Sequence, residues 1–236
     1  MNSIENVQSG HVTRSGERGQ DHSGTEVRTS TGTHLFSIRH GETEWALTGQ
    51  HTGRTDLPLT ARVEAQAIEL GQQRQGIEFP RIFSSPLTRA RQTCERVAPH
   101  RAFARDPDLA EWNYGDYEGK TSADIEQHRS GWDVFKDGCS HGESPAQVAA
   151  RADRLIARLR HETGNIALFS QGQFGVALAA RWVGLGVAEA GHFSLDVASV
   201  SVPACDPHHP EVAVIASWNC VSPERFKSFF ATPTEP

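Results

Sequence analysis

The stretch "HLFSIRHGET" (residues 34–43) decides the fold, because a short apolar run ends directly in an arginine and a histidine. Similar apolar runs that stop at polar turns recur at 81–85, 165–170, 197–202 and 211–218. Short runs of this kind predict buried strands. Helical patterns separate most of them, and such alternation indicates βαβ units with a largely parallel sheet that is covered on both faces.

The spacing of apolar residues predicts a helix that starts at Leu87, with Ser85 as its N-cap and Pro86 in its first turn. A capping-box pattern predicts a second helix after Ser144. Two more helices are predicted over 60–73 and, largely apolar and hence buried, over 172–184.

Composition limits the class of protein. A chain of 236 residues with a net charge of −6 fits one globular domain and has no basic footprint for nucleic acid. No apolar run reaches the length of a membrane span, and the first residues lack a signal-peptide pattern, so we expect a cytoplasmic protein. The four cysteines are widely spaced without a C-x-x-C pair, which predicts reduced thiols.

The chain divides into three segments by composition. Residues 1–33 are polar and without periodicity, which predicts a disordered tail. A catalytic domain is expected over 34–220, and residues 221–236 are predicted to be a C-terminal extension.

Three predicted strands end in polar residues. These ends are Arg39-His40, Ser84-Ser85 and Ser170-Gln171-Gly172. Because ligands of parallel sheets bind beyond the carboxyl ends of the strands, we expect the three ends to meet in one pocket.

The residue types at these ends suit phosphate chemistry. His40 could attack phosphorus, and the planar forks of Arg39 and Arg89 suit phosphoryl oxygens. Glu111 could protonate a leaving alkoxide. Each residue also has a plainer interpretation, since short motifs are weak alone, Arg89 could lie on a solvated helix face and Glu111 could be an ordinary loop carboxylate. Their joint occurrence at strand ends favours a phosphate site.

Three longer motifs carry a family resemblance. "RHGETEW…GQHTGRTDLPLT", "IFSSPLTRARQT" and "LAEWNYGDYEG" together resemble the histidine phosphatase superfamily, the phosphoglycerate-mutase-like group, over about residues 34–218. The resemblance implies a three-layer α/β/α sandwich whose mostly parallel central sheet has an antiparallel edge strand. The motifs are most similar to the branch containing sedoheptulose-1,7-bisphosphatase, which implies a small sugar phosphate or bisphosphate as substrate. It implies no metal or organic cofactor.

The resemblance also assigns roles by position. It makes His40 the nucleophile that becomes phosphohistidine, Arg39 and Arg89 the ligands of the phosphoryl group, and Glu111 the proton donor. Substrate contacts are implied at Thr52, Gly53, Tyr114 and Gly172. The chain lacks the paired-arginine insertion of true mutases, which favours a hydrolase.

One departure lies within the implied site. Where the family has a second catalytic histidine, this chain has Gln171, and Gln173 stands where near relatives often carry a histidine. Glutamine keeps an N–H donor but carries no charge, and a hydrogen bond to a charged group is worth about 1.5–3 kcal/mol against about 0.5–1.5 kcal/mol for a neutral one. Losing such a donor outright costs on the order of 10²–10³ in turnover, so Gln171 predicts reduced activity. Ala46 and Val63 are milder departures.

Three functions therefore remain open at this point. The first is a slow or specialised phosphatase, which the retention of His40, Arg39, Arg89 and Glu111 favours. The second is a pseudophosphatase that binds a phosphorylated ligand or partner without turnover. The third is a hydrolase of phosphohistidine in another protein. The oligomeric state is not indicated by the sequence.

Overall fold

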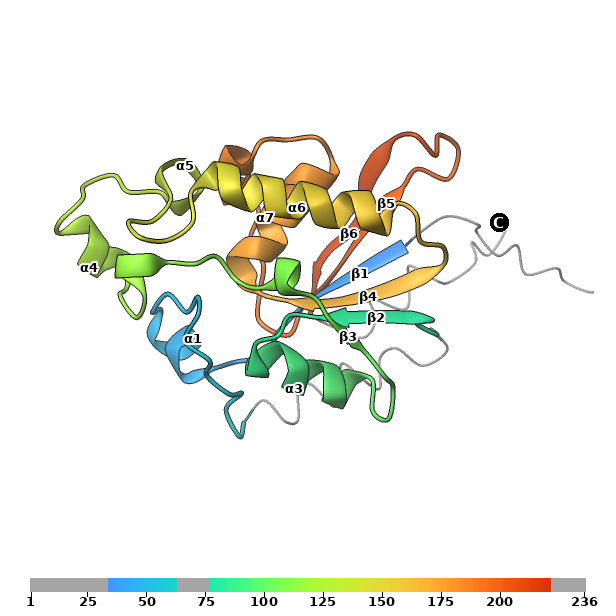
Figure 1. Ribbon diagram of the computed structural model, residues 1–236, viewed down its shortest axis with the longest axis horizontal. Coiled ribbons are helices and arrows are strands. Elements are labelled where there is room, and N and C mark those ends of the chain that lie inside the picture. The colour runs from blue at the N-terminus through green and yellow to red at the C-terminus, as the bar shows by residue number, and fades with distance from the viewer. Residues whose placement is uncertain (1–33, 63–76, 222–236) are drawn as a thin grey trace, which may run out of the picture.

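The computed structural model describes residues 34–62 and 77–221, which fold around one six-stranded sheet (Figure 1). The strands are β1 (His34–Arg39), β2 (Arg81–Ser84), β3 (Ala104–Arg105), β4 (Asn165–Ser170), β5 (Val200–Cys205) and β6 (Ala213–Cys220), in the order β3-β2-β4-β1-β5-β6. The pairs β2–β3, β2–β4 and β1–β4 are parallel, and β5 runs antiparallel to β1 and β6. The predicted fold class is confirmed, with two antiparallel pairings at one edge.

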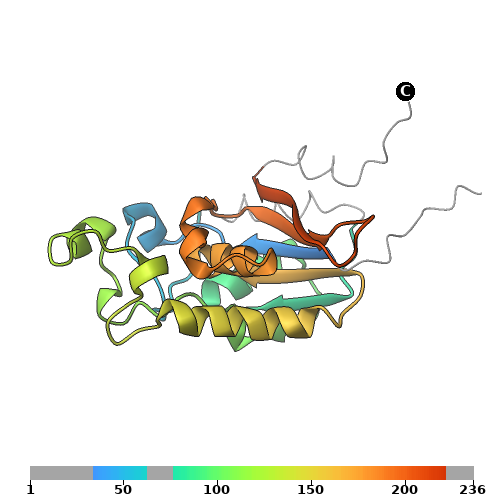
Figure 2. The same ribbon diagram turned by 90° about the horizontal axis from the view of Figure 1, so that it is seen from above.

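Helices form the outer layers. The α-helices are α1 (Glu44–Thr48), α3 (Thr88–Val97), α4 (Ser122–Glu126), α5 (Val134–Asp137), α6 (Pro145–Leu159) and α7 (Gly172–Trp182). Short 3₁₀ turns are η1 (Pro107–Leu109), η2 (Gly115–Tyr117) and η3 (Val187–His192). α6 and α7 pack on one face of the sheet and α3 on the other (Figure 1). Figure 2 shows α1 and α4 beyond the carboxyl ends of β1 and β2.

The central strand β1 is buried on both faces. Leu35 belongs to the apolar cluster under α6 and α7, whereas its neighbour Phe36 belongs to the cluster under α3. Side chains of a strand alternate between its two faces, so a continuous apolar run fits a strand between two helical layers. The polar residues that follow β1 are therefore held at a rigid strand end.

Two of the predicted helices start as expected. α6 has the capping box of Ser144 and Gln147 with Pro145 in its first turn. α7 starts at Gly172, as predicted, and is almost wholly buried. The N-cap predicted for α3 is wrong, because Leu87 occupies that position without a side-chain cap. Instead Asp56, from a distant loop, accepts hydrogen bonds from the N–H and the hydroxyl of Thr88 at 2.6 and 2.7 Å.

The last two strands are displaced from their predicted ranges. β5 begins at Val200, after Ala198 has turned the chain with φ = 55°, and β6 extends to Cys220. The predicted helix over 60–73 falls mainly on residues 63–76, which lie outside the described residues, as do 1–33 and 222–236.

Two further expectations concern the cysteines and the membrane. All four cysteines are free. In the described ranges, no helix is both long and apolar enough to cross a membrane.

Candidate active site

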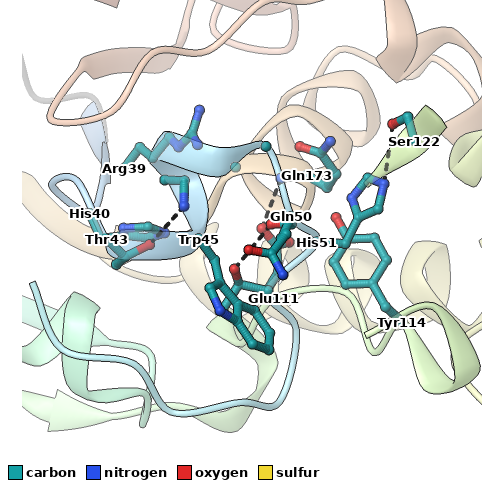
Figure 3. A pocket seen from close by; sticks show the side chains of 14 residues that line it. Arg39, His40, Thr43, Trp45, Gln50, His51, Glu111, Tyr114, Ser122 and Gln173 are labelled. Atoms are coloured by element: carbon teal, nitrogen blue, oxygen red, sulfur yellow. Dashed lines mark hydrogen bonds between the residues drawn. The ribbon is translucent and has the colours of Figure 1, made fainter. Parts of the chain in front are cut away.

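A cavity of about 280 Å³ opens at the carboxyl ends of the strands (Figure 3). Its walls are formed by Arg39, His40, Thr43, Trp45, Ala46, Gly49, Gln50, His51, Thr52, Glu111, Tyr114, Ser122, Gly172 and Gln173. Six of the nine residues predicted for the site are in this set, namely Arg39, His40, Thr52, Glu111, Tyr114 and Gly172. The other three, Gly53, Arg89 and Gln171, lie behind the wall.

His40 is held at the end of β1 by backbone and side-chain contacts. Its N–H donates to the carbonyl of Ser170 at 3.0 Å, its carbonyl accepts from Ala198, and its ring Nδ1 lies 2.6 Å from the carbonyl of Gly41. A carbonyl only accepts, so Nδ1 carries the proton and Nε2 keeps a free lone pair. Burial, with the charges of Arg89 and Arg39, lowers the pKa of His40 well below its ordinary value, and the ring is therefore neutral near pH 7.

Arg39 is the cation on the cavity wall. One terminal nitrogen donates to the carbonyl of Leu195, while its buried Nε has no hydrogen-bond partner in the described structure. A buried unpaired donor costs free energy, and an anion in the cavity could satisfy it. A Cβ at Gly172 would lie 3.2 Å from the guanidinium carbon, so a residue without a side chain lets α7 approach Arg39 closely.

Glu111 connects the loop before η2 to the start of α7. Oε1 accepts from the N–H groups of Trp112 and Phe174 at 2.9 and 2.8 Å, and Oε2 accepts from that of Gln173 at 3.1 Å. Only 6% of the residue is exposed. The three N–H groups fix the carboxyl group in orientation beside the cavity.

The turn of residues 52–55 is held from two sides by opposite charges. Arg89, which is fully buried, donates to the carbonyls of Thr52, Gly53 and Thr55 at 2.9–3.1 Å. Glu118 accepts from the N–H groups of Gly53, Arg54 and Thr55. A Cβ at Gly53 would lie 2.4 Å from the carbonyl of Trp112, so glycine is required there. Arg89 thus shapes the wall, and its charge acts on His40.

Gln171 is fully buried at the N-cap of α7, and both ends of its amide are in use. Oε1 accepts from Nε of Arg89 at 2.9 Å, and Nε2 donates to the hydroxyl of Ser85 at 2.9 Å. Because arginine only donates, the orientation of the amide is fixed. Gln171 therefore joins the ends of β4 and β2 and positions Arg89.

The outer wall consists of aromatic residues. His51 stacks on Tyr114 with ring centroids 4.6 Å apart and meets Trp132 edge-on at 5.4 Å, and its Nε2 lies 3.3 Å from the hydroxyl of Ser122. Burial lowers the pKa of His51 and raises that of Tyr114 well above its ordinary value. Both rings are therefore neutral near pH 7. In Figure 3 they lie across the cavity from Arg39 and His40.

Sequence reasoning missed several of these residues. Glu118 stands inside the recognised motif "EWNYGDYEG", but its partners are 63–65 residues away, and nothing in the sequence links them. Trp45 and His51 also stand inside a recognised motif, but nothing in the sequence indicated that their side chains line the cavity. In the described part of the chain, no group of three or more His, Cys, Asp or Glu residues gathers as a metal site.

Comparisons with known proteins agree with this geometry. The family model of the histidine phosphatase superfamily (branch 1) matches residues 35–219. Sedoheptulose 1,7-bisphosphatase of Saccharomyces cerevisiae is 38% identical over 64% of this chain and 67% of its own length. An acid phosphatase of Mycobacterium tuberculosis is 37% identical over 77% of this chain and 91% of its own.

Solved structures give the same result. The product of an open reading frame of Mycobacterium tuberculosis superposes with a TM-score of 0.73 at 34% identity, covering 79% of this chain and 97% of that one. A putative α-ribazole-5'-phosphate phosphatase of Escherichia coli follows at 0.72 and 28%, covering 80% and 97%.

Proposed function

Because this chain belongs to the histidine phosphatase superfamily, we propose that it hydrolyses phosphomonoesters through a covalent intermediate on His40. The observation that carries the proposal is the state of the His40 ring. Its Nδ1 proton is bound by the carbonyl of Gly41, which leaves the Nε2 lone pair beside Arg39 and Glu111 in one cavity. The substrate is a small sugar phosphate or bisphosphate, in keeping with the name of the yeast relative.

The first step transfers the phosphoryl group to His40. Nε2 attacks phosphorus, the P–N bond forms, and the bond from phosphorus to the alcohol oxygen breaks. Arg39 binds the phosphoryl oxygens through its guanidinium group, and the neutral His40 needs no deprotonation to react. The leaving alkoxide takes a proton from Glu111.

The second step releases phosphate. Water attacks the phosphohistidine, Glu111 accepts the proton of that water, and the P–N bond breaks to regenerate neutral His40. One carboxyl group then acts as acid in the first step and as base in the second. The three N–H contacts hold Glu111 in one orientation for both.

A specific observation favours a second candidate function, a pseudophosphatase that binds phosphorylated ligands without turnover. Both ends of the Gln171 amide are bound to Arg89 and Ser85, and Gln171 does not belong to the cavity wall. The cavity then offers Arg39 as its one wall cation among the described residues. Ground-state binding would survive this arrangement better than stabilisation of the transition state would.

The test is phosphate release by the purified full-length chain from an aryl phosphate and a panel of sugar monophosphates. His40→Ala should abolish release, while the exposed His208→Ala serves as the matched control and should retain it. Rapid acid-free quenching with a radiolabelled substrate should trap an acid-labile phosphohistidine in the wild type. If neither release nor phosphohistidine is found in the wild type but Gln171→His gains both, the pseudophosphatase is correct.

A further inference from the structure

Charge is distributed unevenly along the cavity. Arg39 and Glu111 line it together with His40, whereas the outer wall contributes aromatic rings, amides, hydroxyls and small residues. We infer that the site selects phosphomonoesters with a single phosphoryl group on an uncharged alcohol, and that Gln173 is a determinant of this selection. This inference rests on the proposed function and narrows its substrate class.

The histidine of the outer wall does not substitute for a cation. The His51 ring is packed between Tyr114 and Trp132, and one of its nitrogens faces the hydroxyl of Ser122. These ring and hydroxyl partners are neutral, and burial lowers the pKa of His51 by more than the charge of Glu118 raises it. A second phosphate beside His51 would meet uncharged groups.

Other cations of the described residues near the entrance do not line the cavity. Lys120 lies over the ring of Tyr117 at 5.8 Å, and Arg129 pairs with Asp137 at 3.0 Å. Arg89 is committed to the turn of residues 52–55 behind the wall. None of the three belongs to the residues that form the cavity. A phosphate dianion that left water without such a partner would lose more solvation than it gained in contacts.

The amides of the wall favour hydroxyl groups. Gln50 is already bound to the carbonyl of Gly119 and to Thr48. Within the described residues, the side chain of Gln173 makes no hydrogen bond, and it points into the cavity between Arg39 and His51 (Figure 3). A free amide donates and accepts, which suits an alcohol or sugar hydroxyl, and the faces of His51 and Tyr114 suit a ring.

Gln173 also offers a clean experiment. Its backbone N–H binds Glu111, but its side chain takes no part in that bond, so substitution leaves the carboxylate oriented. The test measures kcat/KM for a matched pair, fructose 6-phosphate and fructose 1,6-bisphosphate. Gln173→Lys puts a cation in the outer cavity, and Gln127→Lys adds the same charge at an exposed position outside it.

We expect the wild type to prefer the monophosphate by about ten-fold or more, since a charge-assisted hydrogen bond is absent for the second phosphate. Gln173→Lys should narrow this preference at least about five-fold, and Gln127→Lys should not. A wild type that prefers the bisphosphate, or an equal response to both lysine variants, overturns the inference and leaves the hydrolase intact.

The two proposals fail in distinguishable ways. If the wild type releases phosphate from no ester, the proposed function fails. Calorimetric affinities of the same two sugars for the wild type then decide the inference, and tighter or equal binding of the bisphosphate overturns it.

Discussion

The carboxyl ends of β1 and β4 are neighbours in the sheet, with Arg39 in register with Ser170, yet the residues that follow them have different roles. After β1, His40 faces the cavity with a free ring nitrogen. After β4, Gln171 is turned inward and is fully used by Arg89 and Ser85. Equivalent positions in a sheet thus supply one ring with a free nitrogen at the cavity, the proposed reactive group, and one side chain that positions Arg89. The difference depends on whether buried partners satisfy the side chain.

Removing the reactive group should have the largest effect. We expect His40→Ala to lower kcat by about 10⁴–10⁶-fold, because the covalent route is lost. Steady-state phosphate release measures this, with fluoride- and divalent-free buffers to suppress background chemistry. Retention of even a tenth of the wild-type rate would show that the end of β1 does not supply the nucleophile.

Removing the partner of Gln171 should mainly affect the turn of residues 52–55. Arg89→Met leaves three carbonyls and the Gln171 oxygen without their donor, so the free energy of unfolding should fall by at least about 3 kcal/mol. Urea unfolding measures the change. Arg91→Met, on the same helix, is the matched control, because its bonds reach only the start of that helix, and it should cost about 1 kcal/mol or less. Equal losses of unfolding free energy in the two variants would contradict the role of Arg89 in holding the turn.

Replacing Gln171 with histidine tests whether the residue after β4 can also take part in catalysis. Gln171→His should raise kcat by about 10–10²-fold, since a chargeable donor is restored at the end of β4. It should also lower stability by about 1 kcal/mol, because a ring cannot reproduce both amide bonds. Paired kinetics and urea unfolding measure the two effects. If the variant loses stability without gaining turnover, the residue at position 171 has a structural role and no role in catalysis.

The smallest effect concerns pH. A buried His40 whose pKa lies well below its ordinary value stays neutral as the pH falls from 7.5 to 6, so kcat at saturation should change by less than about two-fold. A histidine of ordinary pKa would lose about four-fold over the same range. The same lowered pKa affects stability. The unfolded chain takes up the proton of His40 first, so the free energy of unfolding falls as the pH drops below about 6.5. A steep acid limb between pH 7 and 6 would contradict the assignment.

Much of the fold followed from local patterns. The apolar runs and the capping box at Ser144 were sufficient for β1, β2, β4, α6 and α7, since each depends on residues close in sequence. The edge strands were placed less well, because the turn at Ala198 has a positive φ that its residue type does not suggest. The cap of α3 was missed because Asp56 supplies it from 32 residues away.

The site, like the fold, was predictable where it depends on residues close in sequence. Residues at the ends of strands, such as Arg39 and His40, could be located from the sequence because the sheet fixes them. The inward orientation of Gln171 could not, since it depends on Ser85 and Arg89, which are 86 and 82 residues distant. The role of Glu118 was hidden for the same reason.

The turn between Arg89 and Glu118 has a consequence for ligand entry. Its carbonyls face a cation and its N–H groups face an anion, so the peptide dipoles of residues 53–55 are aligned when the protein folds. The loss of backbone entropy, about 1–2 kcal/mol for each residue, is then part of folding and not of binding. A ligand that meets this wall finds a preformed surface, and its affinity is not reduced by the need to order a loop.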